Sequence, residues 1–234
     1  MLDNFDFRED VLKYQTVIKE LHEEIQKKIF AMIPEKWSSL YLYASVIDHF
    51  DKLKTGEMFF YYFPKGMLKK RPVNVYEVPS KFNIEEEQYS RLADDLYKQI
   101  KALRNVQIQS KERAWSNITI IIEKQKYKVI YNYEILTGES FDSIDRRLIW
   151  SYRYLKQPYE SFNKKERELI EKYENEEKPE EIVYELPIYL KNISKRVNTI
   201  KDLQKKIEFV TEDTIEEIEF MNNHVPKSQI LSTK

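Results

Sequence analysis

The sequence predicts an α+β fold in which helices flank an antiparallel sheet of about five strands. Its clearest local signal is a β-hairpin over residues 115–133, where β-branched and aromatic residues alternate with other residues on both sides of a short polar turn. Three further strand-like runs and several amphipathic helical stretches surround it. Strands grouped by hairpins, with helices outside the groups, favour an antiparallel sheet in an α+β domain.

The chain opens with a predicted helix over about residues 8–33. Apolar side chains recur there at three- and four-residue steps, which places them on one face of a helix. We expect this helix to end at Ile33-Pro34, because the residue before a proline is pushed out of the helical region.

Three strand candidates follow, at residues 40–47, 57–63 and 73–78. The second of them has no polar residue after Glu57. Both of its faces are therefore expected to be covered, as in a central strand.

A second amphipathic helix is predicted to end at about Val106. Asn83 is expected to cap its start, with the carboxylates of Glu85, Glu86 and Glu87 near the positive end of the helix dipole. The hairpin follows this helix. No Asn-Gly or Asp-Gly pair occupies its turn, so the turn type stays open.

Beyond the hairpin, helices are predicted over residues 144–155 and 163–177. Pro179 marks a predicted boundary, after which apolar residues keep a helical spacing for about seven turns. The predicted organisation is an α-βββ-α-ββ-α-α domain over residues 1–178 and a helical extension with a frayed tail over residues 179–234.

The long helical stretch at residues 187–210 has two interpretations. Its apolar stripe fits packing on the parent domain, and its length also allows dimerisation or binding in a groove of a partner. A homodimer is therefore one of the possibilities that the sequence leaves open.

Composition narrows the range of partners and compartments. The chain has 234 residues, a net charge of −1 and no cysteine. Strong steering toward nucleic acid or an anionic membrane is not indicated. The absence of disulfides fits a reducing compartment. We find neither a secretory signal nor an apolar run long enough to span a membrane, so we expect a cytoplasmic protein.

No catalytic constellation stands out in the sequence. The histidines, His22, His49 and His224, form no metal-binding pair, and the three glycines lie too far apart for a phosphate-binding loop. We therefore expect no enzyme activity, no metal and no cofactor.

Two stretches could contact a partner. Residues 84–95 carry five acids against Arg91; they form either a solvated helix face or an acidic patch that competes for a basic surface. Residues 146–154 mix arginine with Trp and Tyr, which fits a helix with a buried side or a protein contact.

Several short motifs follow one another along the chain in a specific order and spacing. They are IPEKW at residues 33–37, FFYY at 59–62, VP at 78–79, WSNIT at 115–119 and YNY at 131–133. In this order they resemble the YezG/EsaG-like antitoxin (immunity) family of Gram-positive bacteria. The resemblance covers about residues 14–175. Lys156-Gln157-Pro158 departs from it, because a glycine is expected before the proline.

The resemblance implies a function that the residues alone do not. Proteins of this family are cytosolic and neutralise a cognate polymorphic toxin, often an LXG-type or type VII-secreted nuclease, without a cofactor. We therefore expect an immunity protein that binds a toxin, at its C-terminal nuclease domain. The alternative is an adaptor or self-associating protein that acts through the C-terminal helix.

Seven residues are predicted to contact this partner. They are the aromatic residues Tyr61, Trp115, Tyr131, Tyr133 and Trp150, with Glu86 and Asp94 as charges at the rim. For Trp115 and Trp150 the alternative is burial in the core.

Overall fold

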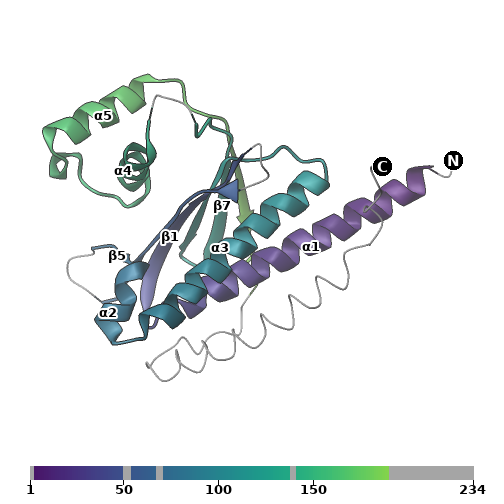
Figure 1. Ribbon diagram of the computed structural model, residues 1–234, viewed down its shortest axis with the longest axis horizontal. Coiled ribbons are helices and arrows are strands. Elements are labelled where there is room, and N and C mark those ends of the chain that lie inside the picture. The colour runs from purple at the N-terminus through teal and green to yellow at the C-terminus, as the bar shows by residue number, and fades with distance from the viewer. Residues whose placement is uncertain (1–2, 50–53, 67–70, 138–140, 190–234) are drawn as a thin grey trace, which may run out of the picture.

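The computed structural model describes residues 3–49, 54–66, 71–137 and 141–189. A six-stranded antiparallel sheet forms the centre of this part of the chain, with helices on both of its faces (Figure 1). The predicted α+β class is confirmed. Most of the predicted extension, including most of the helix at residues 187–210, lies outside the described residues.

The strands of the sheet follow the order β5-β4-β1-β6-β7-β8. They are β1 (Trp37–Ser45), β4 (Met58–Pro64), β5 (Val73–Asn74), β6 (Asn117–Glu123), β7 (Lys126–Asn132) and β8 (Glu181–Leu186). All neighbouring strands are antiparallel. Two short strands, β2 (Ile47–Asp48) and β3 (Lys54–Thr55), pair with each other.

The helices form a layer on each face of the sheet. They are α1 (Asp3–Ala31), α2 (Val78–Phe82), α3 (Glu86–Gln109), α4 (Ser143–Tyr154) and α5 (Lys164–Asn175), with 3-10 turns η1 (Val75–Glu77) and η2 (Tyr159–Ser161). Figure 1 shows α1 and α3 side by side on one face and α4 and α5 on the other.

The main core lies between the sheet and the pair α1 and α3. Alternate strand residues point to one face, and helix residues three and four apart share a face, so the two periodicities meet there. The fully buried contributors include Ile25, Ile29, Leu40, Leu42, Phe60, Leu96, Ile100, Ile118, Ile120 and Val129.

A smaller aromatic core lies on the other face, under α4. It consists of Tyr41, Tyr43, Phe59, Phe63, Trp150 and Leu155. Phe60 and Tyr62 of β4 belong to the main core, so both faces of this strand are covered, as its apolar sequence predicts.

The predicted strand at residues 73–78 is mostly helical. Only Val73–Asn74 pairs with β4, and the chain then turns through η1 into α2. The Asn74 side chain accepts a hydrogen bond from the Tyr76 amide, which starts the turn. Pro79 is the second residue of α2, in the first turn of a helix, where proline is tolerated.

Asn83 does not cap the start of α3. It ends α2 in the left-handed conformation, with φ 53° and ψ 49°, and α3 begins after Glu85. Asparagine tolerates this conformation better than most residues, so a residue suited to begin a helix is here used to end one.

The hairpin turn between β6 and β7 is Lys124-Gln125. Glu123 pairs with Lys126, and the two turn residues have φ of 50° and 63°. Positive φ at both central residues is the type I′ geometry, formed here without asparagine or glycine.

Strand β8 was not predicted. It pairs with β7 over its whole length, from Asn132 opposite Glu181 to Tyr127 opposite Leu186. The predicted division of the chain at residue 178 stays a prediction, and β8, just beyond it, completes the sheet.

Candidate interaction site

Trp115 and Tyr131, two of the predicted contact residues, lie in the main core. Trp115 is 1% exposed, its indole Nε1 donates to Oε1 of Gln107 at 2.8 Å, and its ring stacks on Tyr131 with centroids 5.6 Å apart. Trp115 precedes β6, so the alternation of the strand does not extend to it. Strict alternation would place Trp115 on the same side of the strand as Thr119. Trp115 instead lies in the same core as Ile118.

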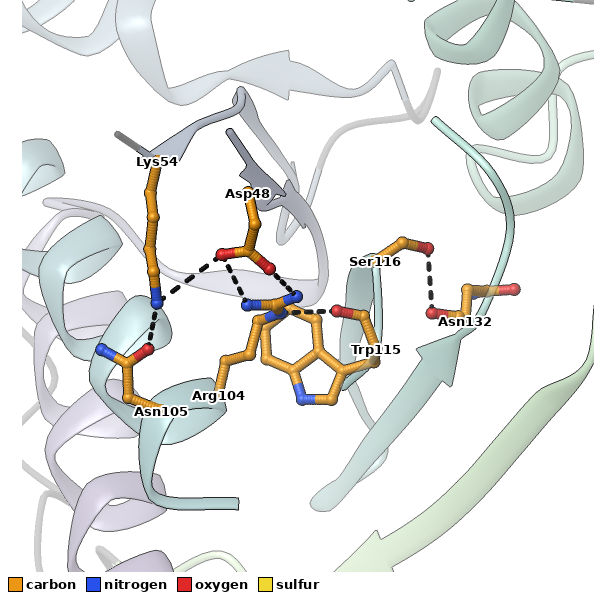
Figure 2. Close-up of polar contacts among 7 residues, drawn as sticks. All are labelled: Asp48, Lys54, Arg104, Asn105, Trp115, Ser116 and Asn132. Atoms are coloured by element: carbon orange, nitrogen blue, oxygen red, sulfur yellow. Dashed lines mark hydrogen bonds and ion pairs between the residues drawn. The ribbon is translucent and has the colours of Figure 1, made fainter. Parts of the chain in front are cut away.

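A buried arginine fixes the backbone at Trp115. Figure 2 shows the Arg104 guanidinium between the Asp48 carboxylate, at 2.6 and 3.2 Å, and the Trp115 carbonyl, at 2.6 Å from Nε. Burial favours the neutral form of Asp48, but the bonds from Arg104 and the charge of Lys54 outweigh it and hold the Asp48 pKa below its ordinary value. These groups join α3 to β2 and to the start of β6.

Trp150 anchors α4 on the opposite face. It is 4% exposed, and its indole Nε1 donates to Oγ1 of Thr119 at 3.0 Å. Its ring packs edge to face against Phe59, with centroids 5.0 Å apart. Three of the seven predicted contact residues, Trp115, Tyr131 and Trp150, are therefore buried in this structure.

A small polar cavity lies beside Trp150, between the sheet and α4. Its volume is about 50 Å³, far below the hundreds of Å³ of typical small-molecule sites. The hydroxyls of Tyr43 and Tyr154 line it without a hydrogen-bond partner among the described residues. Burial also raises the pKa of Glu134 in its wall. Its size suits a few water molecules, not a substrate or cofactor.

The two described histidines have structural partners. His22 is buried between the Tyr127 hydroxyl, 3.1 Å from Nδ1, and the Tyr131 hydroxyl, 3.2 Å from Nε2. Burial lowers the pKa of His22 to about 4. His49 is exposed, with Nε2 2.6 Å from the Thr55 hydroxyl.

The described ranges contain no group of three or more His, Cys, Asp or Glu side chains placed to hold a metal ion. No helix in the same ranges is long and apolar enough to cross a membrane.

A group of aromatic and charged side chains from β4, η1, α3 and α4 lies near the β5 edge of the sheet, where α3 and α4 cover opposite faces. It consists of Tyr61, Tyr76, Asp94 and Arg147, and we refer to it as the Tyr76 surface. The Tyr61 hydroxyl accepts a hydrogen bond from the Arg147 guanidinium at 2.6 Å. Tyr76 is 46% exposed, and its hydroxyl donates to the Met58 carbonyl at 3.3 Å.

Electrostatics place Asp94 in the same group. Burial raises the pKa of Tyr76, the charge of Asp94 adds to this effect, and the charge of Arg147 opposes it. Both charged side chains are exposed. The surface thus combines Tyr, Arg and a carboxylate, a combination suited to binding another protein.

A family model described as immunity protein YezG-like matches residues 18–170. The chain belongs to this family. The resemblance drawn from the motifs is therefore confirmed, and membership supports an immunity or antitoxin role.

Two curated relatives are similar over most of their length. The chain is 27% identical to immunity protein YezG of Bacillus spizizenii W23 over 137 residues, which are 58% of this chain and 81% of the relative. It is 25% identical to immunity protein YezG of Bacillus subtilis 168 over 139 residues, 59% of this chain and 87% of the relative.

The Tyr76 surface lies wholly within the region that matches the YezG-like family. The structure thus joins two predicted residues, Tyr61 and Asp94, with two that sequence reasoning did not select. Tyr76 was missed because its run was interpreted as a strand. Arg147 lies in residues 146–154, where only Trp150 was selected because Trp is a frequent interface anchor.

The other two predicted residues lie elsewhere. Tyr133 is half-buried, with the Arg113 guanidinium 4.4 Å from its ring centre. Glu86 is the exposed first residue of α3. The exposed predicted residues therefore do not form one continuous site, and their part in binding stays a prediction.

Proposed function

We propose that this YezG-like protein is a non-enzymatic inhibitor that binds and neutralises a cognate secreted toxin in the cytoplasm of the producing cell. Membership of the immunity family is the observation that carries the proposal. The two curated relatives, both named as immunity proteins, add support. The small size of the cavity beside Trp150 also favours binding over catalysis.

The toxin is proposed to bind at the Tyr76 surface. Tyrosine and arginine are the residues that most often dominate binding energy at protein interfaces. Tyr61 and Arg147 are already joined by a 2.6 Å hydrogen bond, so little side-chain freedom remains to be lost on binding.

We further propose that the toxin is a nuclease of the LXG or type VII-secreted kind, bound at its C-terminal catalytic domain. A nuclease presents basic groups to the phosphates of its substrate. Asp94 lies on α3, within residues 84–95, which carry a net charge of −4. The exposed acids of this stretch, Glu85, Glu86, Glu87 and Asp94, are proposed to complement a basic groove, either by covering the active site or by binding beside it.

The test combines toxicity and affinity. A candidate toxin domain, to be sought among the genes next to that of this chain, is expressed in a bacterial host with or without the full-length protein. Wild type is expected to restore growth and to bind the purified domain. A wild-type chain that neither protects the host nor binds would overturn the proposed function.

Surface variants locate the contact. Tyr76→Ala and Arg147→Ala are each expected to weaken binding about tenfold or more, with melting temperatures close to wild type. Ile108→Ala is the matched control. Like Tyr76, Ile108 is a large, partly exposed side chain (39% exposed), but it lies near the C-terminal end of α3, outside the Tyr76 surface. Undiminished binding by both Tyr76 and Arg147 variants would show that the toxin binds elsewhere.

The same material tests the adaptor alternative. If the full chain captures only copies of itself or a helical partner, and truncation after Tyr189 removes that capture, the predicted C-terminal helix is the functional part. A homodimer would be recognised by its mass in solution.

A further inference from the structure

The two edges of the sheet differ in length. At one edge β5 is two residues long and turns directly into η1. At the other edge β8 is six residues long, and no described segment pairs with its outer side. An unpaired edge of this length offers a row of backbone donors and acceptors to another strand.

The hydrogen-bonding pattern identifies the outward groups. The Tyr133 amide donates to the Glu180 carbonyl at 3.2 Å, and these two residues lie opposite each other when the β7–β8 register is continued. Hydrogen-bonded pairs alternate in an antiparallel ladder. Ile182, Tyr184 and Leu186 therefore bond to β7.

The backbone groups of Glu181, Val183 and Glu185 then face away from the sheet. Their side chains give the edge an alternating acidic, apolar and acidic sequence. Val183 is 48% exposed. Glu181 accepts a bond from Arg153 at 2.8 Å, and Glu185 one from Lys126 at 3.2 Å.

This sequence disfavours pairing with a second copy. In antiparallel self-pairing centred on Val183, Glu181 of each chain would lie opposite Glu185 of the other. Like charges directly opposite each other destabilise a strand pair. Basic residues at the same two positions would instead be attracted.

We propose that the outer edge of β8 binds an extended strand of a partner protein in which Lys or Arg residues flank an apolar residue at alternate positions. The backbone groups of Glu181, Val183 and Glu185 extend the sheet by one strand. Each carboxylate can accept several hydrogen bonds. Glu181 can therefore bind a basic residue of the partner beside Arg153. Glu185 can bind another beside Lys126. The proposal goes beyond toxin neutralisation, because it concerns an edge outside both the Tyr76 surface and the family match.

The probe is the peptide Thr-Lys-Thr-Val-Thr-Lys-Thr with both ends capped, titrated into the ¹⁵N-labelled full-length protein. The amides of Glu181, Val183 and Glu185 are expected to shift and to saturate. The control peptide, with Glu in place of both Lys residues, is expected to bind about tenfold more weakly.

Two variants separate backbone pairing from charge. Val183→Pro removes an outward amide without removing a bond to β7, and it is expected to abolish peptide binding. Val183→Thr keeps the amide and the side-chain shape, and it is expected to bind like wild type. Glu185→Lys keeps the whole backbone ladder and is expected to reduce the preference for the basic peptide.

Three results would overturn the proposal. They are equal affinity for the two peptides, undiminished binding by both Val183→Pro and Glu185→Lys, and shifts confined to other elements. Pairing of two copies through β8 would be a fourth such result, because the like charges of Glu181 and Glu185 disfavour that pairing.

Discussion

At the scale of single residues, two tryptophans hold opposite layers on one sheet. The Trp115 indole donates to Gln107 of α3, and the Trp150 indole donates to Thr119 of β6. Each ring is buried, and each donor is satisfied. Loss of either residue is therefore expected to lower the free energy of unfolding.

Trp150→Ala is expected to lower the free energy of unfolding by about 3–5 kcal/mol, because it leaves a cavity in the aromatic core and an unpaired Thr119 hydroxyl. Chemical denaturation measures the effect. Tyr76→Ala, at a half-exposed position, is the comparison and is expected to cost about 1 kcal/mol or less. Wild-type stability in the Trp150 variant, with binding lost, would instead place this residue at an interface.

The buried His22 makes stability depend on pH. Its pKa is about 4 in the folded protein, against 6.5 when it is exposed in the unfolded chain. Between these values the unfolded state binds a proton that the folded state does not. Stability therefore falls as the pH is lowered through this range, by on the order of 3 kcal/mol in total.

The expected difference is tested with His22→Gln, which keeps polar atoms but does not titrate. Free energies of unfolding are measured between pH 7 and pH 4 for both proteins. The wild type is expected to lose more stability on acidification than the variant, whatever their difference at neutral pH. Parallel pH profiles would contradict a neutral buried His22.

At the scale of elements, the β6–β7 turn conflicts with its sequence. Lys124 and Gln125 both have positive φ, which is unfavourable for residues with a Cβ atom. The flanking strands impose this geometry, because a type I′ turn has the twist that the paired strands require.

Gln125→Gly is expected to raise the free energy of unfolding by about 1 kcal/mol, because glycine adopts this conformation without steric cost. Lys126→Gly is the matched control. Lys126 lies one residue further along, in β7, where glycine is expected to cost about 0.5–1 kcal/mol. Thermal melts of both variants measure these changes in stability. A loss of stability in the Gln125 variant would refute the turn assignment.

At the scale of the whole molecule, β8 joins the end of the described chain to its beginning. The Gln26 amide of α1 donates to the Pro187 carbonyl and accepts from the Tyr189 amide, each at 3.1 Å. Leu186 and Ile188 pack against the main core. The segment after residue 178 therefore contributes to the stability of the domain.

Truncation tests this contribution. A chain ending at Lys178 is expected to lose on the order of 3 kcal/mol or more, because it gives up the pairing of β8 and the burial of Leu186 and Ile188. A chain ending at Tyr189 is expected to melt within a few degrees of full length. Thermal melts and gel filtration make the comparison, and equal stability of the shorter chain would show that β8 adds nothing.

Much of the fold could be predicted because its signals are local. Apolar periodicity identified α1 and α3, and the alternation around residues 115–133 identified the hairpin. The helices α4 and α5 were also predicted. The order and spacing of the short motifs resemble the YezG/EsaG-like immunity family, and the family match confirms this resemblance.

What the sequence by itself determined is therefore the kind of each strongly periodic element, the α+β class and the family. The tertiary structure showed that EIVYEL is a strand of the sheet. Its Ile, Val and Tyr residues are strong strand formers, but the run is short, and its pairing with β7 is what assigns it to the sheet. The tertiary structure also buried Trp115 and Trp150 and left Tyr76 at the surface. Burial depends on which helix covers which face, and that contact joins residues distant in sequence.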